Sequence, residues 1–190
     1  MMRIITGSAK GKRLATLDGE NTRPTSERIK GAIFSSIQFD IENRAVLDLF
    51  AGSGQLGLEA LSRGAKSAMF VDSAREAIDV VKANAKNTGF FDDCRFLASD
   101  YRNYIRKAGG RESFDLVFID PPYELMCATD ALKRMVDEKM LIPGAIAVLE
   151  TGEEIINHDE LALMGFEIIK STSYGKKTAV TVVLFRGDEQ

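Results

Sequence analysis

From residue 45 onward, short apolar runs alternate with segments whose apolar residues recur every three or four positions. The first pattern predicts buried strands and the second predicts amphipathic helices. The predicted strands cover residues 46–50, 67–72, 94–98, 114–119 and 145–150, and the predicted helices cover residues 55–63, 74–87, 101–108 and 125–138. This alternation is typical of an α/β fold in which helices cover both faces of a parallel sheet.

The last part of the chain has a different pattern. Two apolar runs, 166–171 and 178–185, are separated only by a short link around Gly175. The link is too short for a crossover helix, so the two strands must pair antiparallel. The sequence therefore predicts a seven-stranded, mostly parallel sheet with an antiparallel last strand.

The first 40 residues are predicted to form an extension of the main domain, which covers residues 41–190. Runs 3–6 and 13–16 flank a turn-rich link and predict a β-hairpin. Apolar residues at helical spacing follow from Ile29 to Ile37, and we expect Lys30 on this helix to face solvent or substrate. Since the predicted sheet begins only after residue 45, removing the hairpin is expected to leave the sheet folded.

The charge of the chain is unevenly distributed. The net charge of the 190 residues is -3, yet the first 30 carry 7 basic and 3 acidic residues. A basic arm on an acidic body indicates a polyanionic partner, although a solvated surface hairpin explains the charge equally well. The candidate contacts to such a partner, a nucleic acid, are Arg3, Lys10, Lys12, Arg13, Arg23 and Arg28.

Several classes of protein do not fit the composition. The chain has two widely separated cysteines, Cys94 and Cys127, and a single histidine, His158, so we expect no metal site. It also has no long apolar run and no signal peptide, so we expect a cytoplasmic protein without a membrane partner.

A turn that contains Gly52 and Gly54, called the glycine turn below, joins the first predicted strand to a helix. Glycines let the backbone approach a ligand closely, and the helix start offers unpaired N–H groups to it. Asp72 lies twenty residues after Gly52, so the pattern fits a dinucleotide site as well. Asp48 inside the strand favours S-adenosylmethionine instead, because a carboxylate repels pyrophosphate and attracts the ligand's ammonium group.

A second motif, Asp120-Pro121-Pro122-Tyr123, directly follows the predicted strand 114–119 and is called the tetrad below. The carboxyl end of a parallel strand is where ligands bind in such sheets. Hydride transfer does not need this tetrad, but methyl transfer to an amino group does. The Asp120 carboxylate and the Pro121 carbonyl can accept the amine hydrogens, and Tyr123 can stack on a base.

Taken together, these motifs resemble the RsmD family. The shared segments, in order along the chain, are 3–7, 22–25, 46–54, 57–65 and 118–123. The resemblance implies a class I, Rossmann-like methyltransferase that uses S-adenosylmethionine as its cofactor. Its implied activity is methylation of the N2 amine of a guanine in 16S ribosomal RNA, and we expect a monomer that acts on a small-subunit assembly particle.

The resemblance also implies roles for individual residues. Asp48 would face the cofactor ammonium, Asp72 the ribose hydroxyls and Asp100 the adenine amine, although Asp100 could equally cap the helix that follows it. The remaining cofactor residues would be Phe50, Ala51, Gly52, Gly54 and Tyr101. The catalytic residues would be those of the tetrad, Asp120, Pro121, Pro122 and Tyr123.

Other functions remain open from the sequence. The same cofactor and tetrad could serve an enzyme that methylates adenine N6 in DNA or RNA, or the amide of a protein glutamine. The basic arm argues against glutamine, and the intact Asp48 and Asp120 argue against a non-catalytic ribosome-assembly factor. An NAD-dependent oxidoreductase fits least well.

Overall fold

The computed structural model describes residues 2–17, 27–175 and 178–187. Its seven-stranded sheet has the order β3-β2-β1-β4-β5-β7-β6. The strands are β1 (Ala45–Asp48), β2 (Ser67–Asp72), β3 (Cys94–Ala98), β4 (Phe114–Ile119), β5 (Leu141–Thr151), β6 (Phe166–Tyr174) and β7 (Thr178–Phe185). Strands β1 to β5 pair in parallel, whereas β7 is antiparallel to both β5 and β6. The predicted sheet and its antiparallel hairpin are confirmed.

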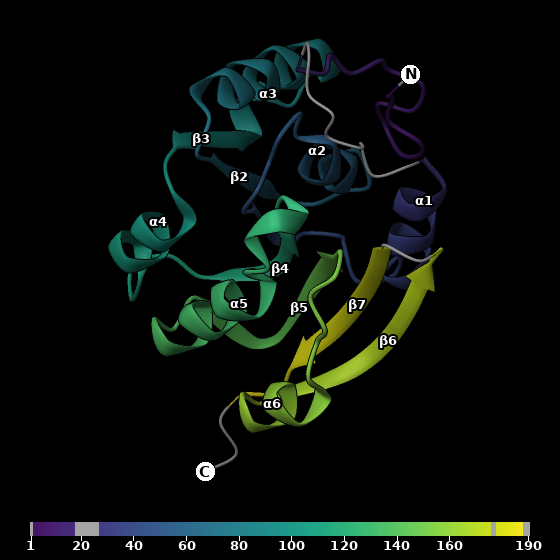
Figure 1. The fold of residues 1–190 in the computed structure, drawn as a ribbon. Helices are drawn as coiled ribbons and strands as arrows, with labels where there is room; N and C mark the ends of the chain where they lie inside the picture. Colours follow the sequence, from purple (N-terminus) through teal and green to yellow (C-terminus); the bar gives the residue numbers. More distant parts are fainter. Residues whose placement is uncertain (1, 18–26, 176–177, 188–190) are drawn as a thin grey trace.

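Helices connect strands β1 to β5 as the hydrophobic pattern predicts, and a further helix precedes β6 (Figure 1). They are α1 (Glu27–Ser36), α2 (Gln55–Ser62), α3 (Arg75–Thr88), α4 (Tyr101–Ala108), α5 (Ala128–Asp137) and α6 (His158–Leu163), with short 3-10 helices η1 (Phe91–Asp93) and η2 (Tyr123–Leu125). No helix in the described parts of the chain is long and apolar enough to cross a membrane.

The starts of one helix and one strand differ from the prediction by three or four residues. The helix predicted over 125–138 starts only at Ala128, because η2 precedes it and Met126 has a left-handed backbone with φ of 42°. The Glu154 carboxylate accepts hydrogen bonds from the N–H groups of Ala128 and Thr129, which fixes this helix start. Strand β5 begins at Leu141 rather than 145, because Leu141 already pairs with β4.

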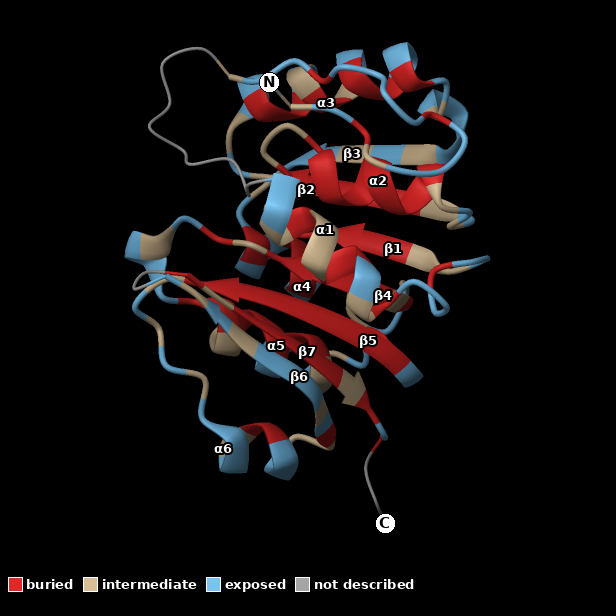
Figure 2. Cartoon of the chain, turned by 90° about the vertical axis from the view of Figure 1, so that its right-hand side faces the viewer, coloured by how far each residue is buried: buried red, intermediate tan, exposed pale blue. Residues whose placement is uncertain are grey.

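Alternate residues of each inner strand pack on opposite faces of the sheet, as strand geometry requires. Leu47, Val117 and Leu149 face a core cluster with α4, α5 and α6. The other cluster packs α1, α2, α3 and the N-terminal segment, residues 2–17, against the opposite face. Figure 2 shows the buried residues along the strands and on the helices that cover them.

The N-terminal segment belongs to this second core cluster. Its Ile4 is fully buried, and on α1 the Phe34 ring packs 5.6 Å from that of Phe118 on β4. Removing the hairpin would therefore expose part of the core, and the expectation that the sheet folds without it does not fit this packing. The division of the chain near residue 40 stays a prediction.

The N-terminal hairpin is shorter than predicted. Arg3 and Arg13 form an isolated antiparallel bridge, and the Ile4 N–H donates to the Lys12 carbonyl at 2.9 Å. Ile5 and Thr6 leave this pairing because their N–H groups donate to the Glu59 carboxylate on α2. The segment is thus tied to the helix that follows the glycine turn.

Candidate functional site

A cavity of about 750 Å³ lies where β1, β2 and β4 end. This edge of the sheet contains the point where the strand order reverses on either side of β1, a common place for ligands. The predicted cofactor and tetrad residues that line it are Asp48, Phe50, Ala51, Gly52, Asp72, Asp100, Tyr101, Asp120, Pro121, Pro122 and Tyr123. The fold therefore brings together two motifs that lie seventy residues apart in the sequence.

The glycine turn has the left-handed backbone that its composition predicts. Gly52 has φ of 51° and Gly54 has φ of 76°, and the Gly54 N–H donates to the Ala51 carbonyl at 2.6 Å. A Cβ atom on Gly54 would lie 2.8 Å from the Val81 side chain. Gly54 is not among the residues that line the cavity; its position fits a role in shaping the turn, and its contact with the cofactor stays a prediction.

Asp48 is a buried carboxylate at the cavity, with an exposed fraction of 2%. Its Oδ2 accepts a hydrogen bond from the Gly57 N–H at 3.0 Å. Burial is the main cause that raises the pKa of Asp48 to about 7; the Gly57 hydrogen bond opposes this shift, and the nearby charge of Asp72 adds to it. A cationic group in the cavity would stabilise the ionised form of this side chain.

Asp72 connects the end of β2 to the glycine turn. Its Oδ2 accepts from the Gly52 N–H at 2.8 Å, and its Oδ1 accepts from the Ala74 N–H at 2.9 Å. Each carboxylate oxygen retains capacity for a further hydrogen bond. Asp72 can therefore shape the turn and also accept hydroxyl groups of a ligand.

Asp100 caps α4, since its carboxylate accepts hydrogen bonds from the N–H groups of Arg102 and Asn103. It also lines the cavity, so its proposed contact with an adenine amine stays a prediction beside the confirmed cap. The Tyr101 ring is buried against Phe50, with 5.3 Å between the ring centroids, and its hydroxyl donates to Asp130 at 2.7 Å. Phe50 and Tyr101 thus form a fixed aromatic wall.

The tetrad makes a closed turn, because the Leu125 N–H donates to the Pro122 carbonyl at 3.0 Å. The Tyr123 side chain packs closely against Gly152, where an added Cβ would be 2.5 Å from Tyr123 Cγ. The Tyr123 hydroxyl donates to Glu150 at 3.2 Å and lies 2.9 Å from the Thr178 hydroxyl. Tyr123 is therefore held at its hydroxyl and packed at the base of its ring.

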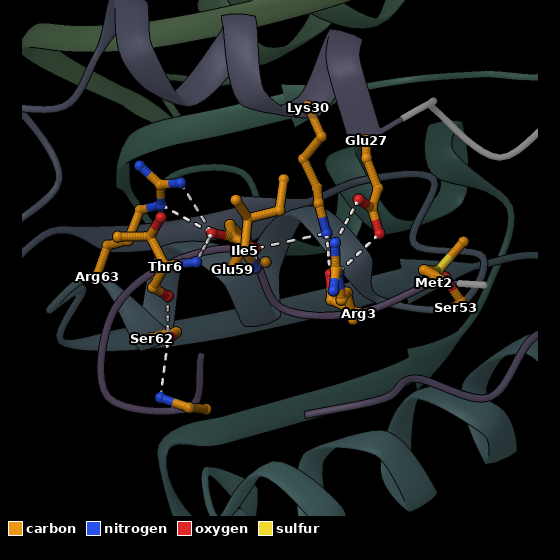
Figure 3. A network of polar contacts seen from close by, with 12 residues as sticks. Met2, Arg3, Ile5, Thr6, Glu27, Lys30, Ser53, Glu59, Ser62 and Arg63 are labelled. Atoms are coloured by element: carbon orange, nitrogen blue, oxygen red, sulfur yellow. Dashed lines mark hydrogen bonds and ion pairs between the residues drawn. The ribbon is translucent and has the colours of Figure 1, made fainter. Parts of the chain in front are cut away.

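A buried ion pair joins α1 to α2, and its carboxylate also fastens the N-terminal segment (Figure 3). Glu59 is fully buried, accepts from the N–H groups of Ile5 and Thr6, and lies 3.4 Å from the Lys30 ammonium. Lys30 is 1% exposed, which corrects the expectation that it faces solvent. Burial lowers the pKa of Lys30, whereas the charge of Glu59 acts in the opposite direction.

Asn84 on α3 makes a second link to the N-terminal segment. Its amide accepts from the Ala15 N–H at 2.8 Å and donates to the carbonyls of Ala15 and Ser53. This places Thr16 and Leu17 in the cavity wall beside the glycine turn. The sequence pattern did not identify Asn84 because its partners lie far away along the chain.

The candidate RNA-binding residues Arg3, Lys10, Lys12, Arg13 and Arg28 are all exposed. Two of them have protein partners: Arg3 pairs with Glu27 at 3.0 Å, and the Lys12 ammonium donates to the Asn87 carbonyl at 2.8 Å. Arg23 lies outside the described residues. Their contact with RNA stays a prediction.

Both cysteines are packed among hydrophobic side chains. Cys127 is buried in the core cluster with α5, and Cys94 is half-buried at the start of β3. Burial raises the pKa of the Cys94 thiol to about 12, which keeps it protonated. Within the described ranges, no group of three or more His, Cys, Asp and Glu side chains could hold a metal ion.

Comparison with known proteins decides the family. The family model described as Conserved hypothetical protein 95, which represents the RsmD family, matches residues 2–183. The chain is a member of the RsmD family. The resemblance seen in the sequence motifs is thereby confirmed.

Individual relatives agree with this assignment. The chain is 39% identical over 156 residues to YlbH of Bacillus subtilis (strain 168), provisionally named an rRNA methyltransferase, and the match covers 81% of this chain and 84% of YlbH. It is 31% identical over 154 residues to ribosomal RNA small subunit methyltransferase D of Haemophilus influenzae, covering 80% of each chain.

A solved structure is similar over nearly the full length of this RsmD-family chain. This is yhhF from Escherichia coli, provisionally described as a methyltransferase, with a TM-score of 0.84, 25% identity and coverage of 98% of this chain and 99% of that one. The fold is the Rossmann-like class I fold of S-adenosylmethionine-dependent methyltransferases, as the sequence predicted.

Proposed function

We propose that the protein transfers a methyl group from S-adenosylmethionine to the N2 amine of a guanine in small-subunit ribosomal RNA. The observation that carries this proposal is the meeting, in one cavity, of the Asp48 and Asp72 carboxylates with the tetrad. Relatives named ribosomal RNA small subunit methyltransferase D support ribosomal RNA as the acceptor.

The residues around the glycine turn fit the cofactor. Asp48 is a buried carboxylate that an ammonium group would stabilise in its ionised form. Asp72 retains acceptor capacity for the two ribose hydroxyls, and Asp100 lies further along the same cavity. The cavity volume falls in the range that encloses a ligand of this size.

When bound, the cofactor supplies a methyl group on a positively charged sulfur, and its sulfur keeps the electron pair of the broken carbon–sulfur bond. An exocyclic amine of a purine is a weak nucleophile because its lone pair is delocalised into the ring. The Asp120 carboxylate and the Pro121 carbonyl accept the amine hydrogens and turn the lone pair toward the methyl group. The two prolines hold both acceptors in place before the base arrives.

Two further parts of the chain complete the proposed activity. Tyr123 stacks on the extruded base, a contact worth about 1 to 3 kcal/mol. Asp120 takes the proton that the methylated amine loses and passes it to solvent. The exposed basic residues of the N-terminal segment, Lys10, Lys12 and Arg13, hold the RNA backbone while the base is in the cavity.

Transfer of a tritiated methyl group tests this function. The purified protein is incubated with assembled small subunits, naked small-subunit RNA and DNA, and the labelled base is identified after digestion. Label in N2-methylguanine from RNA or subunits is the expected result, with Asp120→Ala as the inactive control. Label in N6-methyladenine, or in DNA alone, would refute the proposal.

A further inference from the structure

The strand next to the tetrad carries a carboxylate that the proposed chemistry has not used. Glu150, near the end of β5, is 4% exposed and lines the same cavity as the tetrad. Its carboxylate accepts a hydrogen bond from the Tyr123 hydroxyl at 3.2 Å. The sequence pattern did not single it out because, unlike Asp48, it is not followed by a glycine turn or another motif.

The register of the sheet places Glu150 beside Asp120. Strand β4 pairs in parallel with β5, and Ile119 is opposite Leu149, so Asp120 and Glu150 are one position further along on neighbouring strands. Neighbouring strands lie about 4.8 Å apart. Both carboxylates also act on the Tyr123 hydroxyl: burial raises the pKa of Tyr123, and the charges of Glu150 and Asp120 raise it further.

Two neighbouring carboxylates suit the hydrogen-bonding edge of guanine and disfavour that of adenine. Guanine presents its N1–H and its N2 amine side by side, so both positions donate hydrogen bonds. Adenine presents an N6 amine beside an N1 lone pair, which a carboxylate repels. An ionised carboxylate can accept hydrogen bonds but cannot donate one, so a pair of carboxylates selects an edge that donates at both positions.

We infer that Glu150 accepts the N1–H of the target guanine while Asp120 accepts the N2 amine, which makes Glu150 the residue that selects guanine over adenine. This inference rests on the proposed function and names the contact that sets its base specificity. A bound guanine thus offers one N–H donor to each of the two carboxylates. With adenine the Glu150 carboxylate would face the N1 lone pair, and this repulsion makes the wrong base unfavourable.

A purely structural role for Glu150 would be to hold Tyr123 in place. The two roles are separated by Glu150→Gln, because the glutamine amide keeps an oxygen for the Tyr123 hydroxyl and presents an N–H to the base. The probe is 2-aminopurine, which has the amine of guanine but a lone pair at N1. The wild-type carboxylate opposes that lone pair, whereas the amide of the variant can pair with it.

The experiment compares two RNAs that differ at one position. The guanine methylated by the wild-type protein is first mapped, and the same RNA is then prepared with 2-aminopurine at that position. We expect the wild type to prefer guanine, and Glu150→Gln to reduce the guanine to 2-aminopurine ratio of kcat/KM by about 10-fold to 100-fold. If the variant is inactive on both RNAs, the same ratio is measured as binding affinity in the presence of S-adenosylhomocysteine.

Thr178→Val provides the matched control, because it removes the other partner of the Tyr123 hydroxyl and leaves Glu150 in place. This control should lower activity on both RNAs and leave their ratio unchanged. An unchanged ratio in Glu150→Gln would overturn the inference and leave guanine methylation standing. A wild-type protein that methylates adenine would refute the proposed function itself, and the inference with it.

Discussion

The two walls of the cavity are held together in different ways. On the cofactor wall, formed by the ends of β1 and β2 and the glycine turn, the carboxylates of Asp48 and Asp72 accept hydrogen bonds from nearby backbone N–H groups. On the substrate wall, formed by the tetrad and the end of β5, Tyr123 is held by side chains from β5 and β7.

This difference separates the two functions of the site. The cofactor wall is shaped by hydrogen bonds to the local backbone, so it is already formed when no substrate is bound. It should therefore determine the affinity for the cofactor. The substrate wall depends on side chains from several strands, and in the proposed reaction its carboxylates contact the base. Substitutions on the first wall should therefore change binding, and substitutions on the second should change turnover.

The largest effect is expected on the substrate wall. Asp120→Ala should reduce turnover on RNA by roughly 100-fold to 1000-fold, because the carboxylate stabilises positive charge that develops on the attacking amine. Calorimetry should show an unchanged dissociation constant for S-adenosylmethionine. If cofactor affinity fell together with turnover, the two walls would not have separate functions.

Removing the Glu59 carboxylate, which links α2 to Lys30 and to the N-terminal segment, should lower the stability of the protein considerably. Glu59→Gln leaves the Lys30 ammonium buried without its counter-charge and should lower the free energy of unfolding by about 3 kcal/mol. The exposed pair of Arg3 and Glu27 is the control: Glu27→Gln should lower the free energy of unfolding far less, because solvent screens this pair. Urea unfolding measures both, and equal losses would contradict the importance of burial.

Asp72→Ala should weaken S-adenosylmethionine binding by about 1.5 to 3 kcal/mol, the range for hydrogen bonds to a charged group. Turnover at saturating cofactor should change little, since Asp72 lies on the cofactor wall. Asp72→Asn keeps one acceptor oxygen and should lose less affinity. An unchanged dissociation constant in Asp72→Ala would remove this residue from cofactor binding.

The affinity for the cofactor should depend on pH through the protonation of Asp48. Because burial raises its pKa to about 7, the ligand-free side chain takes up a proton below that pH and must lose it to pair with an ammonium. Cofactor affinity should therefore fall by up to about tenfold for each pH unit below 7. In Asp48→Asn the affinity should be lower and independent of pH over this range, and a retained slope would assign the proton to another group.

The same shift has a consequence for the stability of the ligand-free protein. The folded state binds the Asp48 proton more tightly than the unfolded state, so its contribution to stability is present below the unfolded pKa near 4 and is lost as pH rises to about 7. Saturating cofactor should reduce this loss. Thermal unfolding at several pH values, with and without cofactor, measures both effects.

The smallest effect is expected from the exposed basic residues of the N-terminal segment. Replacing Lys10, Lys12 and Arg13 with alanine should make the plot of log affinity for RNA against log salt shallower by about 2, at roughly 0.7 per phosphate contact. A matched triple alanine variant of the exposed residues Lys66, Lys107 and Lys139 should leave the slope unchanged. Equal slopes in both variants would place the RNA surface elsewhere.

The sequence predicted the fold and the cofactor wall well because their signals are local. Alternating hydrophobic patterns set the strands, and the glycine turn lies within a few residues of Asp48. The burial of Lys30 was also readable in principle, since it lies four residues before Phe34 and so on the same face of α1. Because Lys30 is charged, it was wrongly predicted to face solvent or substrate; no sequence pattern shows that it pairs with the buried Glu59 on α2.

The substrate wall was harder to predict. The tetrad is a contiguous motif, but Glu150 and Thr178 come from other strands, and only the sheet register brings them to Tyr123. Likewise, Asn84 acts on a segment nearly seventy residues away. Contacts of this kind depend on how elements pack, which local spacing does not encode.

The most direct test of the account replaces the target guanosine with inosine, which differs from it only in lacking the N2 amine. The account predicts that the wild-type protein transfers a methyl group to the guanosine-containing RNA and none to the inosine-containing RNA. Continued methylation of the inosine-containing RNA at the mapped position would mean that another atom accepts the methyl group, and would contradict N2 as the acceptor.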